Sequence, residues 1–151
     1  MLSPRTLNTF QGYSNSVFLP YIFGQLQSVR RLDVIWDVYL ADSLKAGTKS
    51  KRSQGQRCKV LPLALLPSTW KSFLKNDKNK SDLFCFLSKK NIYIKNERTP
   101  VSCKILVSTC DDSVVLSSTE VGLNHMSACT HEKAGTRVFL HAVEEDNNTN
   151  C

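Results

Sequence analysis

One stretch of the chain, residues 33–52, combines acidic side chains with a dense run of cations. Asp37 follows an apolar run rich in β-branched and aromatic residues, and Lys45 opens a basic segment a few residues later. An acid at the carboxyl end of a parallel strand stands where α/β folds bind their ligands. Its oxygens suit a hard cation such as Mg²⁺. A metal-binding carboxylate beside a phosphate clamp is typical of metal-assisted phosphodiester hydrolysis, in which the ion activates water.

The basic segment is unusual because no acid balances it. No Asp or Glu occurs from Ser43 to Asn76, whereas eight Lys and Arg residues do. The whole chain has 20 Lys and Arg against 13 Asp and Glu, a net charge of +7 that favours polyanionic partners. Six of these cations are predicted to bind nucleic acid: Lys45, Lys49, Lys51, Arg52, Arg57 and Lys59. The alternative for this arm is a solvated loop whose charge only keeps the protein in solution.

Length and composition indicate a single globular domain. The chain has 151 residues, of which 41% are hydrophobic and 22% charged, so wholesale disorder is excluded. No apolar run approaches the roughly 20 residues that cross a bilayer, so no membrane partner is expected. The first residues lack the features of a secretory signal, which predicts an intracellular protein of the nucleus or cytoplasm. Its six cysteines, which form no Cys-x-x-Cys pair, are therefore expected to be reduced thiols.

The elements that would position this chemistry can be read from hydrophobic spacing. Residues 7–29 carry Tyr13, Tyr21 and other apolar side chains at nearly helical intervals, which predicts an amphipathic helix that Pro20 kinks or splits. The segment Arg31–Tyr39 is predicted to be a short strand. Short helices are predicted over residues 68–73 and 81–90, and the two strands of a hairpin over 104–109 and 113–117. A final helix is predicted over 131–145.

Three stretches of the chain resemble a known group of proteins. They read FLPYIFGQLQSVRRLDVIWDVYLADSLKAGTKSKR, NDKNKSDLFCFLS and CTHEKAGTRVFLHAV, and lie within residues 7–145. They are similar to an uncharacterised animal protein family, associated with mobile elements, that has a PIN-like, flap endonuclease-like domain. The resemblance implies an α/β, partial PIN-like three-layer fold with a short, mostly parallel sheet, helices around it and a flexible basic arm.

The resemblance also implies site residues. Asp37 matches the strand-end acid of the family's metal cluster, and Glu132 matches the first acid of a motif that usually reads Glu-Ala-Asp-Thr-Arg. Here that motif reads EKAGTR, with Gly135 where the second acid is usual. Asp37 and Glu132 are therefore predicted to be vestigial catalytic residues, with Asp37 a weak Mg²⁺ ligand.

Two further acidic elements of the family have no match in this chain, which we interpret as a truncated, degenerate copy. We expect an incomplete domain over residues 1–146, in which 43–66 form the basic arm and linker, and a disordered tail over 147–151. The predicted function is a PIN/flap-endonuclease-like domain that binds nucleic-acid phosphates without competent metal-dependent nuclease activity. One alternative is an active Mg²⁺-dependent 5′ nuclease that recruits acids from 111–112 or 144–146. The other is a non-catalytic protein-interaction fragment.

Overall fold

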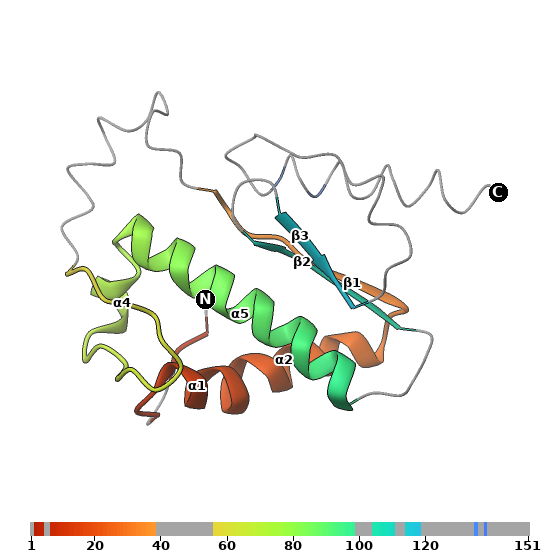
Figure 1. Cartoon of the computed structure of the whole chain (residues 1–151), viewed down its shortest axis with the longest axis horizontal. Helices are drawn as coiled ribbons and strands as arrows, with labels where there is room; N and C mark the ends of the chain where they lie inside the picture. Colours follow the sequence, from red (N-terminus) through yellow and green to blue (C-terminus); the bar gives the residue numbers. More distant parts are fainter. Residues whose placement is uncertain are drawn as a thin grey trace.

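The computed structural model describes residues 2–4, 7–38, 56–98, 104–110 and 114–118, together with 135 and 138. Within these residues the protein is a mixed α/β fold, with helices packed along one side of a small sheet (Figure 1). The predicted helix over 131–145 lies outside the described residues, except for Gly135 and Val138, which are helical and exposed.

The sheet has three strands in the order β1-β2-β3: β1 is Arg31–Val34, β2 is Ile105–Cys110 and β3 is Val114–Ser117. β1 pairs parallel with β2, in the register Arg31 to Ile105, and β2 pairs antiparallel with β3. The predicted hairpin of residues 104–117 is therefore confirmed. The prediction of a mostly parallel sheet is wrong for the described strands, because β2 has one parallel and one antiparallel neighbour.

The N-terminal helical region runs without a gap from Phe10 to Gln27, and its hydrogen-bond pattern changes just before Pro20. α1 (Phe10–Tyr13) leads into a wider π-helical turn over Ser14–Phe18, and α2 (Leu19–Gln27) begins beside Pro20. Because proline has no amide hydrogen to donate, the first turn of a helix is where it fits without a lost bond. The π turn also rotates the helix face that follows it. Tyr21, expected on the inner face, is consequently 51% exposed, and Ile22 is buried instead.

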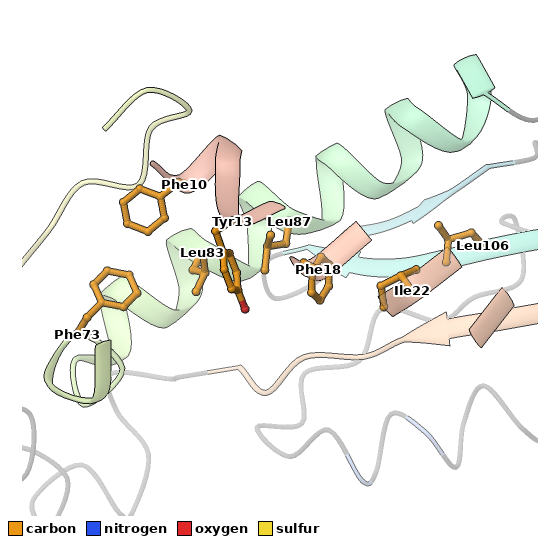
Figure 2. Packing of buried hydrophobic residues seen from close by; sticks show 8 residues of the cluster. All are labelled: Phe10, Tyr13, Phe18, Ile22, Phe73, Leu83, Leu87 and Leu106. Atoms are coloured by element: carbon orange, nitrogen blue, oxygen red, sulfur yellow. The ribbon is translucent and has the colours of Figure 1, made fainter. Parts of the chain in front are cut away.

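A long helix, α5 (Asp77–Arg98), forms the connection between the parallel strands with the short α4 (Trp70–Phe73) before it. It extends well beyond the predicted range of 81–90 in both directions. Leu83 and Leu87 of α5 are fully buried, and they pack with side chains from α1, α2, α4 and β2 in one core (Figure 2). The other members of this core are Phe10, Tyr13, Phe18, Ile22, Phe73 and Leu106. None of the helices that the structure describes is long and apolar enough to traverse a bilayer.

Candidate functional site

Asp37 lies just past the carboxyl end of β1. Regular pairing ends at Val34, so the strand is shorter than the predicted Arg31–Tyr39. The backbone nevertheless stays beside β2, because the Trp36 amide donates a 3.0 Å hydrogen bond to Thr109 Oγ1. Val38 is buried, whereas Asp37 is exposed. Since β1 and β2 are parallel, Asp37 stands at the edge where α/β folds place ligands.

Trp36 fixes the chain next to Asp37. Its indole ring stacks on Phe84 of α5, with ring centroids 4.4 Å apart and planes 11° from parallel. Its Nε1 donates a 2.8 Å hydrogen bond to Ser88 Oγ. Trp36, directly before Asp37, is thus attached to the sheet by its backbone amide and to α5 by its side chain. A side chain on a backbone held this firmly is a better-defined ligand than one on a free loop.

Ser88 is the centre of a buried polar network between α5 and β2. Its hydroxyl lies 2.9 Å from Ser108 Oγ and 2.8 Å from the carbonyl oxygens of Phe84 and Thr109. Ser88 and Ser108 are completely buried, and Thr109 is 2% exposed. A hydroxyl has one hydrogen to donate and two lone pairs, so the hydroxyl of Ser88 is saturated. The network therefore satisfies the polar groups that hold the Asp37 edge.

Arg57, a predicted nucleic-acid contact, is engaged within the protein. Its guanidinium pairs with Asp82 at 2.6 Å and donates a 3.0 Å hydrogen bond to Asn79 Oδ1. Asn79 is completely buried and also binds the amide of Cys58 and the carbonyl oxygens of Gln56 and Phe73. These bonds attach the segment that carries Arg57 to the start of α5.

The remaining predicted phosphate contacts divide into two groups. Lys59 is described and exposed, and among the described residues its ammonium group has no ion pair or hydrogen bond. The others lie outside the described residues: Lys45, Lys49, Lys51 and Arg52. Lys71, Lys75 and Lys78, which were not among the predicted contacts, are exposed on α4 and near the start of α5. For Lys71 and Lys75 the signal in the sequence was the continuation of the acid-free stretch to residue 76; Lys78 follows Asp77, outside that stretch.

The acids are distributed too widely to form a cluster in the part of the chain that is described. Asp33 is held by a bidentate pair with Arg31, at 2.8 Å for both bonds. Glu132 and the acids at 111–112 and 144–146 lie outside the described residues. Across the described ranges, no group of three or more His, Cys, Asp or Glu side chains is placed to hold a metal ion.

The polar network was missed by the sequence analysis, although the sequence carries a signal for it. Ser88 follows Phe84 at an interval of four along α5, next to the inner row that Leu83 and Leu87 form. Polar residues on a row that faces the core are buried with their hydrogen bonds satisfied inside the protein in most cases.

Comparison with models of protein families, with curated proteins and with solved structures finds no match to this chain.

Proposed function

We propose that the chain is a PIN-like domain that binds the phosphate backbone of nucleic acid through its basic arm and does not cleave it. The observation that carries the proposal is the adjacency of two features. Exposed Asp37, at the carboxyl edge of the parallel β1–β2 pair, lies six residues before the acid-free stretch of residues 43–76 and its eight cations, with Asp42 in between. The helix α5 between the two strands completes the strand-helix-strand arrangement on which such edges are built.

The charge distribution supports phosphate binding. Lys59, Lys71, Lys75 and Lys78 are exposed on the described part of the acid-free stretch and the start of α5. Lysine ammonium groups bind phosphates chiefly as point charges. Each phosphate that they neutralise releases condensed counterions, which steepens the log–log dependence of affinity on salt by about 0.9 for duplex DNA and about 0.7 for a single strand.

The absence of cleavage is proposed on the chemistry of the acids. Mg²⁺ affinity depends on the number and charge of its ligands, so a lone carboxylate binds the ion weakly. Gly135 stands where the resembled motif carries its second acid, and glycine has no side chain to supply an oxygen. In the described part of the chain Asp37 belongs to no group of three or more His, Cys, Asp or Glu side chains, whereas metal-assisted attack on a phosphodiester relies on such a group to hold the ion.

The test is fluorescence anisotropy with labelled single-stranded, duplex and flap DNA at two salt concentrations, with Mg²⁺ present and the products run on a gel. We expect affinity to fall steeply with salt and the DNA to remain intact. The double variant Lys49→Ala/Lys51→Ala should reduce the salt slope by about 1 to 2. Arg30→Ala is a control, because Arg30 is exposed at the opposite end of β1 from Asp37.

Two results would overturn the proposal in different ways. Affinity that does not change with salt, or no binding at all, would favour a protein-interaction fragment. Cleavage that needs Mg²⁺ and disappears in Asp37→Ala would identify an active nuclease and contradict the non-catalytic assignment.

A further inference from the structure

The last part of the predicted arm and linker, residues 58–66, carries both partly buried and exposed side chains. Cys58, Val60, Ala64 and Leu66 pack against the core. The three leucines between and beside them face outward: Leu61 is 57% exposed, Leu63 80% and Leu65 75%. Large apolar side chains gathered on one surface, unlike single exposed ones, mark an interaction site.

The backbone holds these leucines in place. The Ala64 amide donates to the Leu61 carbonyl at 3.1 Å, which closes a turn with Pro62 at its second position. The segment is then fastened to the N-terminus by hydrogen bonds from Phe10 N to Ala64 O at 3.2 Å and from Leu66 N to Asn8 O at 2.8 Å. The leucines therefore project from an ordered scaffold, which we call the leucine turn (residues 61–65).

A hollow lies beside the leucine turn. It has a volume of about 430 Å³, and its wall includes Pro4, Leu7, Leu65, Leu66 and Trp70. Leu65 belongs both to the leucine turn and to this wall, so the two surfaces are continuous. Polar residues line the hollow as well, so it can take apolar side chains of a ligand together with polar groups beside them: Ser3, Asn8 and Ser68.

Cations without acids accompany this apolar surface. Lys59 precedes the leucine turn by two residues, and Lys71 follows Trp70 on α4. Both are exposed, and neither has an ion pair or hydrogen bond among the residues that the structure describes. Like-charged partners are disfavoured at such a surface, and carboxylates are favoured.

We propose that the leucine turn and the adjoining hollow bind a peptide segment of a partner protein in which apolar side chains are flanked by carboxylates. The apolar side chains would cover Leu63 and enter the hollow beside Leu65, while the carboxylates would face Lys59 and Lys71. This inference does not depend on nucleic-acid binding, because the phosphate backbone offers nothing to cover the leucines.

Other partners fit the surface less well. A second copy of the chain would set lysines against lysines across a symmetric contact, since both copies present the same patch. An anionic membrane would complement the lysines and the turn, but a bilayer surface does not fill a hollow in the protein. A peptide satisfies the leucines, the hollow and the charge together.

The test uses a fluorescein-labelled peptide with three leucines set among glutamates, titrated with the whole chain by anisotropy. Control peptides carry lysine in place of glutamate, or serine in place of leucine. We expect the acidic leucine peptide alone to bind. Leu63→Ser/Leu65→Ser should weaken binding at least about tenfold, since burial of one leucine contributes roughly 1.5–3 kcal/mol and 1.4 kcal/mol is tenfold. Lys71→Glu should weaken it about threefold or more, because it places a carboxylate against those of the peptide.

Val29→Ser is the matched control, because Val29 is 40% exposed after the end of α2, away from the leucine turn in the sequence. The leucines are so exposed that their replacement should leave the thermal unfolding midpoint unchanged. Equal binding of all three peptides, or full binding by the leucine variant, would overturn the proposal. So would a leucine-dependent association with anionic phosphatidylserine vesicles, or leucine-dependent dimers in sedimentation equilibrium, without binding of the peptide.

Discussion

Replacement of Ser88 by alanine should destabilise the protein far more than the loss of one small hydroxyl suggests. In the structure, Ser88 Oγ accepts the Trp36 indole N–H at 2.8 Å, lies 2.9 Å from Ser108 Oγ, and reaches two carbonyl oxygens. Alanine provides neither donor nor acceptor. The indole N–H would then lose its partner beneath the stacked Phe84 ring, and the Thr109 carbonyl would lose its side-chain donor.

The magnitude follows from the cost of polar groups left unsatisfied. Each buried donor or acceptor without a partner costs about 1–3 kcal/mol. Ser108 retains a weaker alternative, because its hydroxyl also lies 3.4 Å from the Val34 carbonyl. The indole N–H is therefore the main loss, with a smaller contribution from the Thr109 carbonyl. Against this, alanine favours a helix interior over serine by about 0.5 kcal/mol. We expect a net loss of about 2–3 kcal/mol from the free energy of unfolding.

The assay is urea unfolding followed by circular dichroism. With a slope of about 1.5 kcal/mol per molar urea, the midpoint of Ser88→Ala should fall by roughly 1.3–2 M. Ser81→Ala is the matched control, since Ser81 lies on the same helix and its hydroxyl bonds only the Asp77 carbonyl, at 3.2 Å, among the contacts of the described residues. Its midpoint should move by less than about 0.5 M. Equal midpoints for the two variants would refute the polar network as a source of stability. A Trp36→Phe/Ser88→Ala cycle should give a coupling energy of about 1 kcal/mol.

Three further predictions concern Tyr13, Asn79 and Arg57. Burial raises the pKa of Tyr13 to about 12, against 10.0 for an exposed tyrosine. Because the unfolded chain releases this proton first, stability should be unaffected below pH 10 and fall by up to about 1.4 kcal/mol per pH unit from 10 to 12. Tyr13→Phe should unfold with a shallower dependence over that range, and an unchanged slope would contradict the assignment. Asn79→Ala should cost about 1–3 kcal/mol in thermal unfolding, because it leaves the half-buried Cys58 amide without its partner, whereas the Phe73 carbonyl keeps a 3.3 Å bond from the Asn76 amide. Arg57→Ala breaks a half-exposed ion pair with Asp82 and should lower the free energy of unfolding by less than about 1 kcal/mol. A larger loss would contradict the view that this pair contributes only as much as a surface ion pair.

The elements that the sequence predicts well are those whose signals are local. Pro20 marks the place where the π turn gives way to α2, because its missing amide acts on its own turn. The hairpin of β2 and β3 follows from two β-branched runs separated by a short polar gap. The outward position of Tyr21 was not predictable in this way. It depends on the π turn before it, which inserts an extra residue into a helical period that spacing alone treats as constant.

The other differences arise at polar residues that hydrophobic spacing does not take into account. The predicted end of α5 near residue 90 rested on the last regularly spaced apolar residues. The helix instead continues past Asn91, which is buried although it is polar. Similarly, β1 ends at Val34, yet the chain as far as Trp36 stays on the sheet through a bond to Thr109, which is 73 residues away in the sequence. Sequence periodicity carries no information on a hydrogen bond between residues so far apart.

The two proposed surfaces share one acid-free stretch, and their physical chemistry separates them. Phosphate binding by the arm is a counterion effect, so its affinity should decline steeply with salt. Binding at the leucine turn depends mostly on apolar burial, which salt weakens little and sulfate strengthens. Lys49→Ala/Lys51→Ala should therefore lower DNA affinity and spare the acidic peptide, while Leu63→Ser/Leu65→Ser does the reverse. If one variant abolished both, a single surface would serve both ligands, and peptide and DNA would have to compete for it.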